Sequence, residues 1–140
     1  MPQVKVVGTV RASGPRIWDV IGDFNAMPKW HPAIAGSTLE NKDGATLRRL
    51  SLQGGGGILE RLEEKNDGER YYTYTIVESP LPIADYRSTI QVRPAADAAS
   101  STVEWIGTFR VTDGPEADAE QVIRGIYTAG IDNLKRMLGG

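Results

Sequence analysis

Apolar residues recur at intervals of three and four along residues 115–138, near the C-terminal end of the chain. Because an α-helix has 3.6 residues per turn, this spacing gathers them into one stripe. Pro115 suits a first helical turn, Lys135 and Arg136 suit the negative end of the helix dipole, and Gly139 ends the pattern. We predict a long helix from Pro115 to Leu138 with a buried stripe of Val122, Ile123, Ile126, Tyr127, Ile131, Leu134, Met137 and Leu138.

One line of this stripe ends at Gly130, which follows Val122 and Ile126 at steps of four. A glycine inside a helix costs about 1 kcal/mol relative to alanine, so its presence calls for a reason. Two reasons remain open: close packing on a neighbouring backbone, or space left for a ligand.

Alternation of apolar and polar residues with a period of two predicts a first strand at residues 4–10. A helix of about two turns is expected next, with Ser13 as its N-cap and Pro15 in its first turn. Residues 24–36 contain two prolines and two aromatic residues, which indicates a second short helix or an ordered loop.

Between residues 37 and 112 the pattern changes to short apolar runs separated by turn residues. These turns lie at residues 41–44, 54–57, 66–68, 79–82 and 94–101. Six further strands, joined mostly as hairpins, are predicted. Together with the first strand they form a seven-stranded antiparallel sheet, and a sheet with helices on one face is an α+β arrangement. A long helix laid across such a curved sheet leaves a cavity between them.

The alternation also predicts which side chains face the long helix. The inward positions include Tyr74, Tyr86, Trp105 and Phe109. These aromatic side chains either form a plain hydrophobic core or line the cavity. A tyrosine can do both, because its ring packs while its hydroxyl makes hydrogen bonds.

Two charged residues share faces with apolar residues. Arg48 has the same parity as Leu50, and Glu60 has the same parity as Ile58. Charged groups are rarely buried without partners. Arg48 and Glu60 are therefore expected to form a mutual ion pair or the polar end of a binding cavity.

His31 is the only histidine and the only side chain expected to titrate near neutral pH. A structural role and a catalytic role both remain open for it. The four consecutive glycines are more than one tight turn needs, so they form either a mobile flap over the cavity mouth or a long hairpin. A phosphate loop is only weakly supported, because no lysine and no helix start follow them. This loop consists of Gly54, Gly55, Gly56 and Gly57.

The 140 residues suit one domain, residues 1–140, and 40% apolar with 24% charged residues is usual for a soluble protein. A net charge of −2 with interspersed signs argues against nucleic-acid binding, and no apolar run approaches the ~18 residues of a membrane helix. The absence of cysteine and of a secretory signal places the chain in the cytoplasm. With one histidine, we expect no metal site and no cofactor.

Several motifs, taken in order, resemble the START-like or SRPBCC superfamily, and within it the polyketide cyclase/dehydrase-like branch. This resemblance implies the helix-grip fold, in which a curved antiparallel sheet grips the C-terminal helix around a hydrophobic cavity. It also implies an apolar ligand such as a lipid, hormone, flavonoid or polyketide. The motifs are IWDVIGDFNAMPKWHP (17–32), GATLRRL (44–50), ILERL (58–62), SPLPIADYRSTI (79–90) and VEWIGTF (103–109).

The chain is also similar to the plant abscisic-acid receptors and to the class 10 pathogenesis-related proteins. By this resemblance the glycine loop matches a gate loop, and Glu60 and Tyr86 match residues that line the cavity. His31 stands where the receptors have a buried lysine that pairs with a ligand carboxylate, so an acidic ligand is not implied. The serine and leucine-proline of the receptor gate are absent, which argues against signalling through a partner phosphatase. The resemblance assigns a latch loop to Ser79, Pro80, Leu81 and Pro82.

The sequence thus predicts a protein, monomeric or homodimeric, that binds a hydrophobic small molecule of lipid, polyketide or aromatic natural-product type. The alternative is a polyketide cyclase, dehydratase or lyase in which Glu60 or His31 is the general acid or base. A third class, an interaction module, would need an exposed apolar patch that the alternation does not predict. The predicted ligand-binding residues are Trp30, His31, Arg48, Glu60, Tyr74, Tyr86, Trp105, Phe109, Val122, Ile126, Tyr127 and Gly130.

Overall fold

The computed structural model describes residues 2–139. Within them, seven strands form one antiparallel sheet in the order β1-β7-β6-β5-β4-β3-β2. The strands are β1 (Gln3–Val10), β2 (Ile34–Lys42), β3 (Ala45–Leu52), β4 (Gly57–Asn66), β5 (Tyr71–Glu78), β6 (Ile83–Pro94) and β7 (Ser101–Val111), and the helices are α1 (Gly14–Ile21), α2 (Met27–Trp30) and α3 (Glu116–Leu138).

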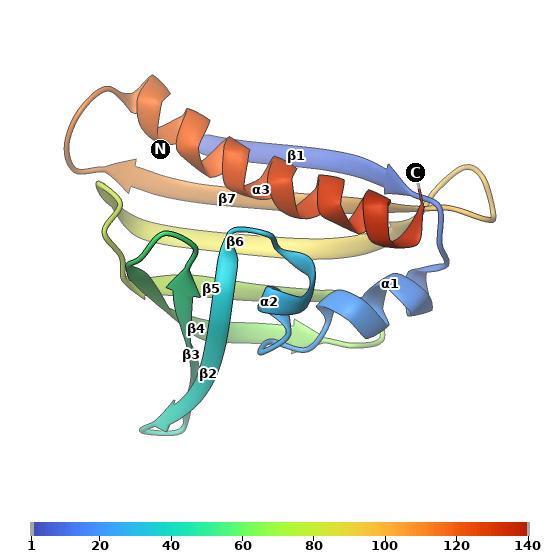
Figure 1. Ribbon diagram of the computed structural model, residues 1–140, viewed down its shortest axis with the longest axis horizontal. Coiled ribbons are helices and arrows are strands. Elements are labelled where there is room, and N and C mark those ends of the chain that lie inside the picture. Colours follow the sequence, from blue (N-terminus) through green and yellow to red (C-terminus); the bar gives the residue numbers. More distant parts are fainter. Residues whose placement is uncertain (1, 140) are drawn as a thin grey trace.

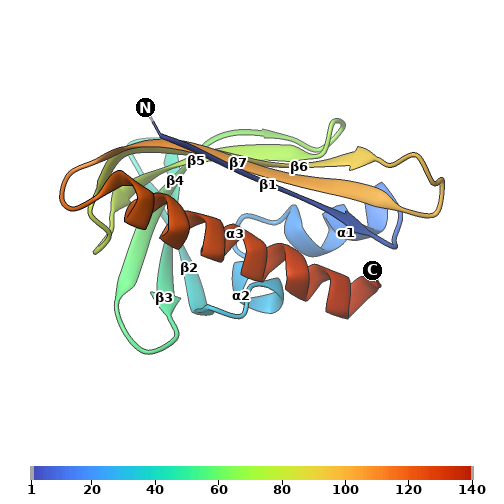
Figure 2. The same ribbon diagram turned by 90° about the horizontal axis from the view of Figure 1, so that it is seen from above.

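The first strand pairs with the last, and both lie at one edge of the sheet. β1 lies antiparallel to β7, with Val6 opposite Trp105. Helix α3 follows β7 and packs mainly on β1, with fewer contacts to β7 and α2 (Figure 1). Figure 2 shows all three helices on one side of the sheet, with β2 and β3 curving toward that side. The predicted α+β helix-grip architecture is confirmed.

Local signals place the helices close to their predicted positions. Ser13 caps α1, because its side chain accepts a hydrogen bond from the Arg16 N–H at 3.3 Å. Residues 27–30 form the short helix α2, one of the two alternatives left open for this segment. Pro115 has an extended backbone and is the N-cap of α3, so the helix starts one residue later than predicted.

The buried face of α3 differs from the predicted stripe at its edges. Its buried residues include Ile123, Tyr127, Ile131 and Leu134, as predicted. Val122 is 48% exposed and Met137 is 45% exposed. Because consecutive helical residues are about 100° apart, Val122 points away from the sheet when Ile123 points into it. The prediction that Val122 lines the internal cavity is therefore wrong.

The space beside Gly130 is filled by aromatic rings. A Cβ atom at this position would lie 2.8 Å from His31 Cδ2 and 2.9 Å from ring carbons of both Trp30 and Trp105. The residue allows α3 to approach these side chains closely. Of the two reasons left open for Gly130, close packing describes the structure and space for a ligand does not, although the packing partners are side chains and not a backbone.

Candidate ligand-binding cavity

A cavity of about 200 Å³ lies between α3, the end of α2 and the concave face of β3 to β6. Five of the predicted ligand-binding residues line it: His31, Glu60, Tyr74, Tyr86 and Ile126. The other lining residues are Met27, Ala33, Ile34, Leu50, Leu52, Gln53, Ile58, Ile76, Leu81 and Ile123.

The remaining predicted residues lie behind this lining or outside it. Trp30, Trp105, Phe109 and Tyr127 are almost fully buried in the hydrophobic core and do not line the cavity. They support the residues that do. For this group the plain core interpretation, one of the two left open for the aromatic side chains, describes the structure better than direct ligand contact.

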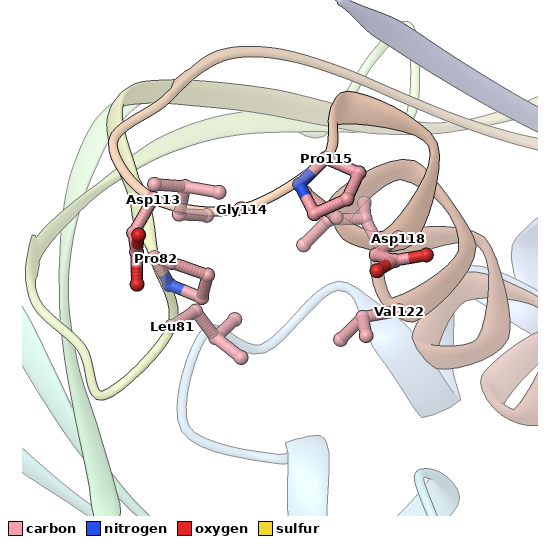
Figure 3. Close-up of a pocket in the computed structure, with 10 residues that line it drawn as sticks. Leu81, Pro82, Asp113, Gly114, Pro115, Asp118 and Val122 are labelled. Atoms are coloured by element: carbon pink, nitrogen blue, oxygen red, sulfur yellow. The ribbon is translucent and has the colours of Figure 1, made fainter.

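A second hollow, of about 270 Å³, lies at the surface beside the start of α3. In Figure 3, Leu81 and Pro82 form one wall and Pro115, Asp118 and Val122 the other. Leu81 and Ile123 line both hollows and so lie between them. Val122 therefore belongs to this surface groove.

The strand register brings Arg48 and Glu60 together. They are direct partners across β3 and β4 on the concave face. Arg48 Nε donates to Glu60 Oε1 at 2.7 Å, with Arg48 fully buried and Glu60 4% exposed. The predicted ion pair is confirmed, and Glu60 also lines the cavity while Arg48 lies behind it.

Arg48 is held from several sides. Its Nη1 donates to the Phe24 carbonyl at 2.8 Å and to the Tyr72 hydroxyl at 3.2 Å. Its guanidinium carbon lies 4.0 Å from the centre of the Phe24 ring, a cation–π contact. Burial lowers the pKa of Arg48, but Tyr72, Glu60 and Tyr74 outweigh this and the pKa is raised overall. The guanidinium is therefore always charged.

Two opposing effects act on Glu60. Burial raises the pKa of Glu60, because a low-polarity environment disfavours the charged carboxylate. The positive charge of Arg48 and its hydrogen bond oppose this rise. The result is an ion pair whose carboxylate has a higher pKa than an exposed glutamate.

Both ring nitrogens of His31 are occupied by backbone groups. The Ala33 N–H donates to Nδ1 at 3.1 Å, so Nδ1 carries no proton. Nε2 therefore carries the proton and donates to the Ile126 carbonyl at 2.7 Å. Burial lowers the pKa of His31, which favours this neutral form. In this arrangement His31, at the end of α2, is hydrogen-bonded to α3 and has no free nitrogen for acid–base chemistry.

A buried cluster of hydroxyl groups forms the other polar part of the cavity wall. Tyr86 shares hydrogen bonds with Tyr127 and, at 3.4 Å, with Tyr74. Ser88 Oγ lies 2.8 Å from the Tyr127 hydroxyl, and Trp105 Nε1 donates to Ser88 Oγ at 3.0 Å. Burial raises the pKa of all three tyrosines, so they are neutral at physiological pH. Only Tyr74 and Tyr86 reach the cavity.

Sequence reasoning missed Ser88 and Gly107 as parts of this cluster. A Cβ at Gly107 would overlap the Tyr127 hydroxyl, so the glycine makes room for it. The available signal was that both residues have the inward parity of their strands while carrying little apolar surface. Two small inward-facing residues among aromatic residues leave space on the sheet that a side chain from another element can fill.

The two loops singled out in the sequence meet the cavity. Gly54, Gly55 and Gly56 have positive φ in the turn after β3, whereas Gly57 begins β4. Leu52 and Gln53, just before the glycines, line the cavity. Leu81, in the loop after β5, also lines it. Both loops thus border the same hollow.

Within residues 2–139, no helix is long and apolar enough to cross a membrane. In the same part of the chain, histidine and acidic side chains form no group that could hold a metal ion.

Comparison with known proteins identifies the family. Residues 1–139 match the family described as polyketide cyclase / dehydrase and lipid transport. The chain is 38% identical to the protein XoxI from Bacillus cereus, with a TM-score of 0.94 over 99% of this chain and 96% of that chain. A putative uncharacterized protein from Bacillus thuringiensis is 37% identical, with a TM-score of 0.91 over 97% and 98%.

A more distant relative supports the fold alone. A START superfamily protein from Mycobacterium smegmatis is 17% identical, with a TM-score of 0.79 over 97% of this chain and 96% of that chain. No curated protein matches the sequence. The chain belongs to the polyketide cyclase / dehydrase and lipid transport family and has its START-like helix-grip fold.

Proposed function

We propose that the protein binds a compact hydrophobic small molecule in the internal cavity. The observation that carries this proposal is a mostly apolar cavity with few polar lining side chains, namely His31, Gln53, Glu60, Tyr74 and Tyr86. Ligand sites commonly combine apolar walls with a few polar groups. Because apolar burial contributes about 25 cal/mol per Å², affinity does not require many polar contacts. Membership of the family supports this function.

The volume of the internal cavity limits the size of the ligand. A cavity of about 150 Å³ is known to hold benzene, and this one has about 200 Å³. A molecule of one or two aromatic rings therefore fits the structure as it stands. A long lipid or a large polyketide requires the cavity to widen at the loops that border it.

Filling the cavity tests the proposal. Ile126→Trp places an indole into the lining, whereas Val122→Trp places one on the same helix outside it. We expect Ile126→Trp to weaken the calorimetric affinity for 2-naphthol at least tenfold, and Val122→Trp to leave it near wild type. The reverse result would place the ligand in the surface groove.

Native mass spectrometry of the protein purified from its source provides a second test. A small apolar guest that travels with the protein supports the proposal. A consistently empty protein contradicts it.

A second candidate function is a cyclisation or dehydration reaction that uses Glu60 as general base. Its support is that this carboxylate lines the cavity and that burial raises its pKa. Glu60 would take a proton from a carbon beside a carbonyl group and return it in a later step. His31 is neutral, and each of its ring nitrogens is hydrogen-bonded to a backbone group. It is therefore better suited to a structural role than to proton transfer.

This candidate is tested with acetophenone in deuterated water. NMR would follow exchange of its methyl protons in the presence of wild-type protein and of Glu60→Gln. Acceleration by wild type that disappears in the variant supports catalysis. Equal slow exchange with both proteins contradicts it.

A further inference from the structure

We infer that the cavity selects neutral molecules with a hydroxyl group, a phenol or an alcohol, and discriminates against carboxylates. The hydroxyl donates a hydrogen bond to the second carboxylate oxygen of Glu60. This inference rests on the proposed binding function and adds the chemical class of the ligand's polar group. It follows from which polar atoms at the cavity wall are already engaged.

Most polar side chains at the wall are already engaged. His31 uses both ring nitrogens on backbone groups. The Tyr74 hydroxyl accepts a hydrogen bond from Trp105 Nε1 at 3.2 Å and lies 3.4 Å from the Tyr86 hydroxyl. The Tyr86 hydroxyl also pairs with Tyr127. Gln53 also lines the cavity, but it is exposed in the loop after β3. Among the buried lining groups Glu60 is different, because one of its two oxygens is still available.

The geometry of the ion pair leaves that oxygen unused. Arg48 Nε and Nη2 form one edge of the guanidinium, which can hold both oxygens of a carboxylate at once. Here only Nε is paired with Glu60, through Oε1. Nη2 is buried and has no hydrogen-bond partner. Among residues 2–139, Arg48 is the only hydrogen-bond partner of the Glu60 carboxylate, and it contacts Oε1, so Oε2 remains an acceptor.

The charge that faces the cavity is negative. Glu60 belongs to the lining, whereas Arg48 lies behind it and is held by Phe24 and Tyr72. A carboxylate ligand would meet the Glu60 carboxylate across a low-polarity space, where like charges repel strongly. An ammonium ligand would bury a charge close to the Arg48 cation. A neutral hydroxyl avoids both costs and forms a charge-assisted hydrogen bond.

Three probes that share a naphthalene ring and differ only in the substituent at position 2 separate these chemistries. They are 2-naphthol, 2-methoxynaphthalene and 2-naphthoate, titrated calorimetrically into the wild-type protein near pH 7. The ether keeps the oxygen but cannot donate, and the naphthoate is an anion. A hydrogen bond to a charged acceptor predicts that 2-naphthol binds about tenfold or more tightly than the ether. We expect 2-naphthoate to bind most weakly.

The outcomes distinguish the two proposals. Equal affinities for 2-naphthol and its ether would overturn the hydroxyl selection and leave the binding function standing. Tightest binding by 2-naphthoate would also overturn the selection alone. If none of the three binds, both the binding function and the inference that rests on it are wrong.

A double substitution tests whether Glu60 accepts the hydrogen bond from 2-naphthol. Replacing Arg48 with Met and Glu60 with Leu together removes the pair without leaving an unpaired buried charge. We expect the preference for 2-naphthol over its ether to fall to about onefold. Ile126→Val, a change in the apolar lining, should alter both affinities together and keep their ratio. A preference that survives the double substitution would show that Glu60 is not the acceptor. The wild-type titrations test the selection even if this variant folds poorly.

Discussion

Gly107 of β7 lies directly opposite the hydroxyl of Tyr127 in α3, and the missing side chain of one makes room for the other. A Cβ at position 107 would overlap that hydroxyl and displace it from Ser88 and Tyr86. We predict that Gly107→Ala lowers the free energy of unfolding by about 1 to 3 kcal/mol, the usual cost of overpacking. Urea denaturation provides the measurement.

Gly125 is the matched control for this substitution. It lies on the exposed side of α3, and a Cβ there would meet no atom within 4 Å. Gly125→Ala should stabilise the protein by about 0.5 to 1 kcal/mol through helix propensity. If Gly107→Ala stabilises the protein as well, the close approach to Tyr127 is wrong.

The buried ion pair predicts strongly non-additive substitutions. Arg48→Met or Glu60→Leu alone leaves the other charge buried without its partner, which costs about 3 to 5 kcal/mol of unfolding free energy. The double substitution removes both charges and should cost clearly less than the sum of the two. Chemical denaturation of the four proteins measures this coupling. Additive losses would mean that the two side chains act independently.

His31 predicts a loss of stability at mildly acidic pH. Burial lowers its pKa below the ordinary value of 6.5, so the unfolded chain takes up the proton first. Its contribution to the unfolding free energy is complete above pH 6.5 and is lost as the pH falls from 6.5 toward the folded-state pKa. The measurement compares wild type and His31→Gln at pH 7.5 and pH 5.5. The variant should lose less stability between these two pH values, and an identical loss would contradict the prediction.

Binding is predicted to order the loops that border the cavity. Residues 54–57 follow the lining residues Leu52 and Gln53, and Leu81 lines the cavity itself, so their amide hydrogens should exchange more slowly when 2-naphthol is added. Mass-spectrometric hydrogen exchange measures this. The turn at Asp43 and Gly44 does not contribute to the lining and provides the internal reference. Unchanged exchange at residues 54–57 during saturating binding would exclude their action as a gate.

The sequence alone determined the architecture, because the signals for it are local. The period of three and four in α3, the alternation along β6 and β7, and the turn residues between strands each depend on neighbours in the chain. Parity also placed Arg48 and Glu60 on the apolar face, where each needed a partner.

Only the tertiary structure decided how these faces meet. The register of β3 against β4 made Arg48 the partner of Glu60. The rotation of α3 turned Val122 outward, and the approach of Trp30, His31 and Trp105 filled the space beside Gly130. These outcomes depend on contacts between residues far apart in the chain, which no periodicity along the chain encodes. For the same reason, the pairing of His31 with the Ile126 carbonyl, 95 residues later, could not be predicted from the sequence.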